Sequence, residues 1–330
     1  MTTSPDIAPA VPAASDQQGV ARRAAPEPGS SAGAPARAAA AVAPAAIGRG
    51  VVRGVRAVVG PRPALLDGLA LVLVALLLVA VVAGPWLAPA DPYRADPTSA
   101  LLPPGAGHLL GTDDAGRDIL SRLLVGARTT LLAAVGVVAL STVVGVLVAA
   151  VAAAGPRWLD ETLMRGVDIF LAFPSIVLAL GIAAALGPSL SSVVIAMVVA
   201  MWPATTRLVR NVMRETMSGQ YVEAARLTGM STPRVMRRHV LPNSLDSVYV
   251  QLGLDVSGAI VLIAGLAFLG VGAPPPSADW GSMVAQGREY VTTAWWVSLF
   301  PGLAITLAAV AFGLLGDALR ARLDPTVVRA

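Results

Sequence analysis

The sequence predicts an all-α polytopic membrane protein with six transmembrane helices, and its composition is the first reason. Of the 330 residues, 55% are hydrophobic and only 13% are charged, with a mean hydropathy of +0.71. Soluble domains carry about 25% charged residues. Long uncharged runs recur along the chain, and arginines gather between them. This pattern indicates several helices whose surfaces face lipid.

The composition also excludes several classes of protein. There is no cysteine, which excludes a disulfide framework, a thiolate metal site and a cysteine nucleophile. All 24 basic residues are arginine, and a chain without lysine lacks the residue with which a P-loop reaches nucleotide phosphates. The chain is therefore not a Walker-type ATPase by itself. Arginines that flank hydrophobic runs are explained by membrane topology, so no nucleic-acid partner is expected.

Residues 1–60 are predicted to form a disordered cytoplasmic tail. They are rich in Ala, Pro and Gly, show no helical or strand periodicity, and lack the apolar area that would offset the entropy of ordering. No apolar core of a cleaved signal peptide precedes residue 64. The membrane domain is expected to cover residues 64–326.

Uncharged runs locate the membrane spans in order. The predicted spans lie within 67–91, 128–157, 168–187 and 189–207, and at about 247–270 and 294–316. Between Asp168 and Arg207 stand 38 uncharged residues, which would make about 57 Å of helix at 1.5 Å per residue. That length is nearly twice a bilayer core of about 30 Å, so the run must fold back. Gly187-Pro188-Ser189 is the expected turn.

The arginine distribution predicts the orientation. With the N-terminus inside, 19 of the 24 arginines fall in cytoplasmic segments and five fall outside. The positive-inside rule then places both termini in the cytoplasm of a multi-pass protein of the cell membrane.

The long polar segment at about 207–245 is predicted to contain two short helices separated by a glycine. Gly229 suits a left-handed C-terminal cap. Thr232 is expected to cap the second helix, with Pro233 at its first position. Pro242 is expected to end that helix.

The spacing in this segment carries a family resemblance. A Glu-Ala-Ala run at Glu223, a glycine at Gly229 and a block at 239–242 that ends in Leu-Pro resemble the coupling loop of bacterial ABC importer permeases. The resemblance implies that the loop docks into a groove on an ATP-hydrolysing subunit. It assigns coupling to Tyr221, Glu223, Ala224, Ala225, Arg226, Gly229, Leu241 and Pro242. A generic helix-turn-helix between two spans is the alternative.

The segment between the first two spans combines a polar turn with an apolar pattern. Residues 108–118 form the turn, and residues 119–128 repeat apolar side chains at helical spacing, which predicts an amphipathic helix at the outer interface. His108, Asp113 and Asp114 could be read as metal ligands. A structural turn is preferred, because one histidine and two adjacent acids give poor coordination geometry, and no metal site is expected.

That segment resembles the signature of C-type permease subunits of dipeptide, oligopeptide and nickel importers. Similar motifs follow at 268–302 and 316–325, so the resemblance covers about residues 64–326. Relatives carry an acid shortly before the Phe-Leu-Gly motif, where this chain has Ile263-Ala264-Gly265. Three tryptophans near the sixth span fit an interfacial aromatic belt: Trp280, Trp295 and Trp296.

Asp255 is the one acid within the predicted fifth span. An ionisable group in a membrane helix marks a functional site by default, so Asp255 is a candidate for the translocation path. A buried structural hydrogen bond is the alternative.

The resemblance implies a non-catalytic permease subunit of an ABC importer for di- or oligopeptides, which forms half of a translocation pathway. Its implied partners are a homologous B-type permease, two cytoplasmic ATP-binding subunits, an extracellular or periplasmic solute-binding protein and membrane lipid. No cofactor is expected. Nickel or another small solute is the alternative cargo.

Two rivals belong to other classes. A membrane-embedded hydrolase would use His108 or Asp255, but it lacks a nucleophile–base pair, because His239 would lie across the membrane. For a non-transporting anchor, the coupling loop would have no purpose.

Overall fold

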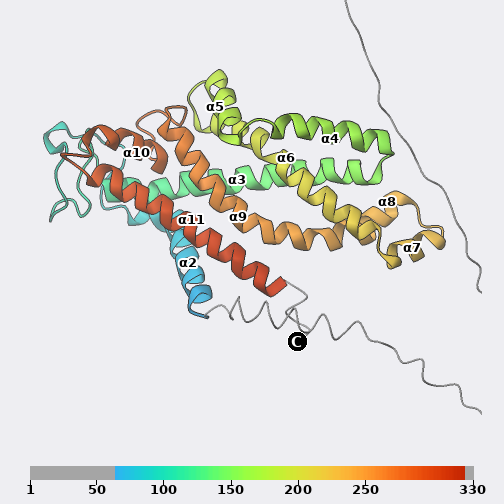
Figure 1. Ribbon diagram of the computed structural model, residues 1–330. Coiled ribbons are helices and arrows are strands. Elements are labelled where there is room, and N and C mark those ends of the chain that lie inside the picture. The colour runs from blue at the N-terminus through green and yellow to red at the C-terminus, as the bar shows by residue number, and fades with distance from the viewer. Residues whose placement is uncertain (1–63, 324–330) are drawn as a thin grey trace, which may run out of the picture. The chain divides into compact units, whose positions relative to one another are not determined.

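The computed structural model describes residues 64–323, and this part of the chain is helical (Figure 1). The predicted tail, residues 1–60, lies outside the described residues. The α-helices are α2 (Ala64–Leu87), α3 (Ile119–Ala154), α4 (Arg157–Leu171), α5 (Ser175–Leu186), α6 (Leu190–Met217), α7 (Gln220–Leu227), α8 (Thr232–Val235), α9 (Leu241–Phe268), α10 (Trp280–Gly287) and α11 (Trp296–Leu323). Short 3-10 helices lie at Pro97–Ser99 (η1) and Arg288–Tyr290 (η3), and a π-helical segment, η2, lies at Met236–Val240.

The predicted fold class is confirmed. Among the described residues, five helices are long and apolar enough to cross a membrane: Leu66–Leu87, Ile119–Ala154, Leu190–Met217, Thr232–Phe268 and Trp296–Ala321. A sixth crossing arises if α4 and α5, which are bent by 84°, act as one broken span. The turn at Gly187-Pro188-Ser189 separates α5 from α6, and Gly187 has the positive φ of 87° that a glycine adopts readily.

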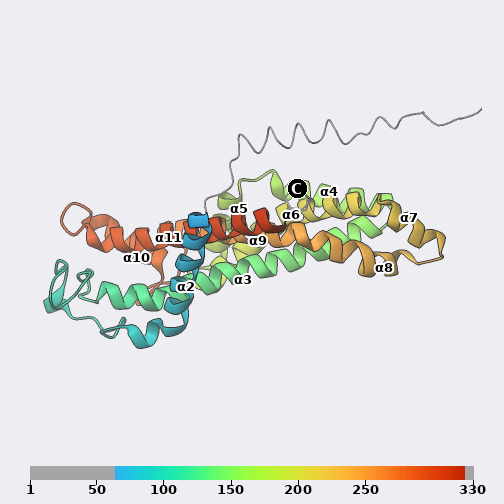
Figure 2. The ribbon, with the colours of Figure 1, turned by 90° about the horizontal axis from the view of Figure 1, so that it is seen from below.

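Helices α3, α6 and α9 run side by side through the bundle (Figures 1 and 2). Helix α11 packs along α9, α2 contacts both α3 and α11, and α4 lies against α6. A continuous hydrophobic core joins buried side chains of α3, α6, α9 and α11, including Val137, Met197, Ile260 and Ala308. Figure 2 shows that α10 and the loop 88–118 lie at one end of the bundle, and α7 and α8 at the other. We call these the α10 end and the α7 end.

Two glycines bring α9 and α11 into backbone contact. A Cβ atom on Gly253 would lie 2.4 Å from the Cα of Gly316, and one on Gly316 would lie 2.9 Å from the amide nitrogen of Leu254. Small residues at helix crossings allow this close approach. It increases van der Waals contact between the helices, which matters in a membrane because the hydrophobic effect does not drive helices together there.

The second crossing helix begins earlier than the sequence predicts. Residues 119–128 are the first turns of α3 and not a separate interfacial helix. Asp118 caps α3 by accepting a hydrogen bond from the Ser121 amide, and both Ile119 and Arg122 are fully buried. The apolar stripe was interpreted as facing the interface, but α10 and α2 contact it: Trp280 donates to the Leu123 carbonyl at 3.0 Å, and a Cβ atom on Gly84 would lie 2.4 Å from the Leu124 carbonyl oxygen.

The third span also differs from its prediction. Its helix starts at Arg157, so it includes charged residues that the uncharged-run criterion left out. The helix breaks between Leu171 and Ser175, where Pro174 cannot donate a backbone hydrogen bond. Helix α5 alone has 12 residues, which is about 18 Å and too short to cross a bilayer core.

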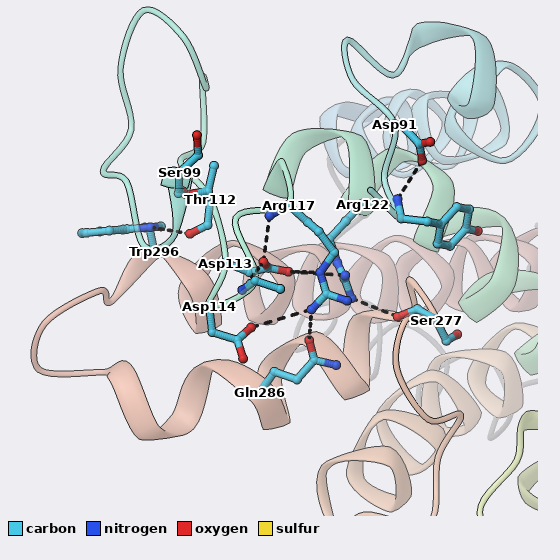
Figure 3. A network of polar contacts seen from close by, with 12 residues as sticks. Asp91, Ser99, Thr112, Asp113, Asp114, Arg117, Arg122, Ser277, Gln286 and Trp296 are labelled. Carbon is cyan, nitrogen blue, oxygen red and sulfur yellow. Dashed lines mark hydrogen bonds and ion pairs between the residues drawn. The ribbon is translucent and has the colours of Figure 1, made fainter. Parts of the chain in front are cut away.

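An ion-pair network closes the α10 end of the bundle (Figure 3). The Asp113 carboxylate accepts a 2.8 Å hydrogen bond from Nε of Arg117 and lies 3.3 Å from a guanidinium nitrogen of Arg122. Arg122 donates to the carbonyl oxygen of Ser277 at 2.9 Å, and Arg117 donates to the side-chain oxygen of Gln286 at 3.3 Å. This Asp113 network therefore ties the start of α3 to the segment around α10.

The alternative reading of His108, Asp113 and Asp114 as metal ligands is not supported by their contacts. His108 Nδ1 lies 3.0 Å from a carboxylate oxygen of Asp118, whereas Asp113 faces two arginines. Asp114 lies 3.7 Å from Arg117. The three side chains form hydrogen bonds and ion pairs within the turn and with α3. These contacts suit a structural turn.

The Asp113 network yields a stability prediction. Asp113→Asn removes the charge shared by two arginines whose side chains are 6% and 0% exposed, and breaking a buried pair in this way costs about 3–5 kcal/mol. The neighbouring variant Asp114→Asn is the control, because its side chain is 37% exposed and such surface pairs contribute about 0–1 kcal/mol. Thermal unfolding of the purified protein should show a large loss for Asp113→Asn alone. Equal losses would contradict the role given to Asp113.

The glycine crossing yields a second prediction. Gly253→Ala forces α9 and α11 apart, and overpacking of this kind costs about 1–3 kcal/mol. Gly258→Ala, in the same helix, is the matched control because a Cβ there meets nothing within 4 Å. The midpoint of thermal unfolding in detergent should fall for Gly253→Ala and stay within error for Gly258→Ala. An unchanged midpoint for both variants would show that the crossing is not tightly packed.

Candidate coupling surface and translocation cavity

The polar segment at the α7 end folds as the predicted helix, glycine break and helix. Helix α7 ends in a Schellman motif, in which the Met230 amide donates to the Ala225 carbonyl and the Gly229 amide to the Arg226 carbonyl. Gly229 has a φ of 84°, and a Cβ there would meet nothing within 4 Å. Its conformation, and not the space around it, is what requires glycine.

The second helix differs from the prediction at both ends. Its N-cap is Ser231 and not Thr232, which is the first helical residue, and Ser231 makes no side-chain capping bond. Pro242 does not end the helix. The π-helical segment η2 lets the Leu241 amide donate to the Met236 carbonyl, five residues earlier, and α9 continues directly. The wider π turn accommodates the proline, which has no N–H to donate.

The underside of the loop is anchored in a hydrophobic cluster. Val222 of α7, Val235 of α8 and Val240 of η2 are fully buried. They pack with Val209 and Met213 from the end of α6. The loop is therefore attached to both α6 and α9 by apolar contacts.

The opposite face of the loop is open. Tyr221, Glu223, Ala224 and Arg226 are exposed, as are Gly229 and Pro242, while Ala225 and Leu241 are half-buried. The structure thus brings the predicted coupling residues together around α7 and the start of α9.

Two residues in this region were missed by the sequence analysis. Leu227 is 84% exposed, the highest value among the large apolar side chains that the structure describes. Asn243 donates to the His239 carbonyl at 2.7 Å and to the Tyr221 hydroxyl at 3.4 Å, so it links α9 to α7. The Tyr221 and His239 rings also meet edge-on, with centroids 6.4 Å apart.

A cavity of about 370 Å³ lies between α5, α6 and α9. Met201, Ala204 and Thr205 line it from α6, and Gln251 and Asp255 from α9. Asp255 is half-buried and accepts a 2.9 Å hydrogen bond from the Gln251 amide. It follows the first residue of α9 by 14 positions and precedes the last by 13, which is about 20 Å from either end. The candidate path residue therefore lies at the middle of α9.

Comparison with known proteins agrees with these features. Residues 141–329 match the family described as binding-protein-dependent transport system inner membrane components. A Brucella suis protein named as a peptide transport system permease is 48% identical over 258 residues, which cover 77% of this chain and 86% of the relative. The di/tripeptide transport system permease protein of Pseudomonas aeruginosa is 42% identical over 261 residues, covering 77% and 86%.

The fold also matches a solved transporter. The inward-facing methionine ABC transporter MetNI contains a chain that aligns with a TM-score of 0.51 over 61% of this chain and 95% of that chain, at 18% identity. The motifs indicated a permease component with no catalytic role of its own, and the family match supports that prediction. The chain therefore belongs to the family of binding-protein-dependent transport system inner membrane components, multi-pass proteins of the membrane.

Proposed function

We propose that this chain forms one half of the translocation pathway of an ABC importer for peptides. The proposal rests on one observation: α6 and α9 both line the cavity and both hold the α7 loop. Helix α6 lines the cavity through Ala204 and anchors the α7 loop through Met213. Helix α9 lines it through Asp255 and joins the loop through Val240 at its N-cap.

The exposed face of α7 is the surface that docks on an ATP-binding subunit. Glu223 and Arg226 offer charges of both signs, and Leu227 offers an apolar side chain. This composition suits a specific protein contact. A movement of α7 would displace α6 and α9 together, because the buried valines of the loop pack directly against both helices.

The cavity is lined by helices of one chain and supplies only part of a pathway. A homologous B-type permease completes it, two ATP-binding subunits occupy the cytoplasmic face, and a solute-binding protein delivers cargo to the α10 end. The arginine distribution supports an orientation with the α7 end and both termini in the cytoplasm.

The named relatives and the cavity lining favour peptides as the cargo. The permease relatives at 42% and 48% identity are named for peptide transport. Five of the nine residues that line the cavity are apolar, and such a wall accommodates varied side chains. This lining favours a peptide over nickel.

Coupling can be tested at Gly229. Gly229→Pro should abolish uptake while the protein still inserts, because proline cannot adopt the positive φ that the Schellman motif requires. Gly229→Asn is the matched control, since asparagine tolerates this conformation and has open space around its Cβ. Peptide uptake and cargo-stimulated ATP hydrolysis should be measured in the assembled complex.

The loss for Gly229→Pro should exceed about tenfold in uptake, which corresponds to about 1.4 kcal/mol in an activation barrier. ATP hydrolysis should then no longer respond to cargo. Full uptake by the proline variant would refute the coupling role of this loop.

Orientation can be tested with single cysteines, because the chain has none of its own. Ser231→Cys lies at the α7 end and Thr292→Cys follows α10, and both positions are exposed. A membrane-impermeant maleimide added outside intact cells should label Thr292→Cys and should label Ser231→Cys only after permeabilisation. The reverse pattern would invert the proposed topology, and labelling of both from outside would reject it.

A further inference from the structure

Asp255 is half-buried, and it differs from two buried acids that pair with arginines. Asp113 pairs with Arg117 and Arg122, and Asp160 of α4 pairs with two arginines of α6. Asp255 has no such cation among the described residues, and its one hydrogen bond comes from a neutral amide. A carboxylate in a membrane helix without a counter-charge is costly, and it is normally retained for a ligand or an ion.

Asp255 and Gln251 line the same cavity and are joined by one hydrogen bond. The two residues are one helical turn apart, and the Gln251 nitrogen donates to Oδ1 of Asp255. This bond uses a donor of the amide and leaves Oδ2 of Asp255 and the Gln251 oxygen available. Thr205 lines the same cavity from α6. A Cβ atom added to Gly145 of α3 would lie 3.0 Å from the methyl group of Thr205. The methyl group of Thr205 therefore faces α3.

We propose that Asp255 and Gln251 bind the α-ammonium group at the amino terminus of the peptide cargo. The inference rests on the proposed function and names the chemical group by which the site recognises its substrate. An ammonium group offers three donors and one positive charge. It therefore matches a carboxylate oxygen and an amide oxygen, and it supplies the charge that Asp255 lacks.

The rest of the cavity fits the remainder of a short peptide. The wall beyond Asp255 includes Ala200, Met201 and Leu262. Small and flexible apolar side chains accept many residue types, and methionine adapts its shape to different ligands. The amino terminus is the cationic group common to unmodified peptides, so its recognition is independent of the sequence of the cargo.

The test uses a cysteine in the cavity wall as a reporter. Ala204→Cys is exposed in the cavity, and the complex is reconstituted with any cysteines of the other subunits replaced. The rate of maleimide labelling is measured against increasing trialanine, trialanine amide and N-acetyl-trialanine. The last two peptides block the carboxyl and amino termini in turn.

Trialanine and its amide should protect the cysteine at similar concentrations, and N-acetyl-trialanine should need at least about tenfold more, the size expected for one hydrogen-bonded charge. Asp255→Asn in the same background should raise the protecting concentration of trialanine about tenfold and leave that of the acetylated peptide unchanged. Asp255→Glu should restore part of the preference. Asp246→Asn, an exposed acid earlier in α9, is the control and should change nothing.

Several results would overturn the inference. Equal protection by acetylated and free peptides would show that the amino terminus is not recognised. An equal loss for all three peptides in Asp255→Asn, together with weaker subunit assembly, would assign Asp255 to an ion pair with the homologous permease. Peptide uptake without any protection of Ala204→Cys would overturn this site and leave the proposed function intact, whereas an absence of peptide uptake would contradict the proposed function itself.

Discussion

The exclusion of water from the bilayer core is the constraint on which this structure depends, because every backbone N–H and C=O there must find a partner within the protein. The chain satisfies it with helices, and at the bend after α4 it uses local hydrogen bonds. Between α4 and α5, the Ala172 amide donates to the Asp168 carbonyl and the Phe173 amide to the Phe170 carbonyl. Pro174 follows and has no N–H to satisfy. The sharp bend therefore leaves no donor open at the end of α4.

The spans were predictable because charge and hydrophobicity act locally, whereas their ends depended on distant partners. The uncharged run before Arg207 and the turn at Gly187 were sufficient to predict a fold-back. The start of α3 was mispredicted, because the uncharged run begins only after Arg128 and leaves out the buried Arg122. Its cost is offset by Asp113 and by the carbonyl of Ser277, a residue 155 positions away. No local pattern contains that information.

The candidate site also has one part that the sequence predicts, the α7 loop, and one part that it does not, the cavity. The loop was predictable because a glycine with fixed spacing to Glu223 encodes a Schellman-capped helix directly. The cavity was not predictable, since its walls come from three helices that only the folded bundle brings together. Asp255 alone gave a signal, as a charge within an apolar run. Leu227 gave none, because an exposed leucine and a buried one look identical in a sequence.

The charged contacts at the α7 end extend the connection from the loop to the third wall of the cavity. Asp160 of α4 accepts hydrogen bonds from Arg210 at 2.8 Å and from Arg214 at 2.6 Å, and Asp168 pairs with Arg207. These pairs join α4 to the half of α6 that packs on the α7 loop. Because α4 leads within three residues into α5, all three helices that line the cavity are attached to the same end of the bundle. The α7 loop is thus joined to α6 and α9 by packed apolar side chains, α4 is joined to α6 by ion pairs, and the short break between Leu171 and Ser175 separates α4 from α5.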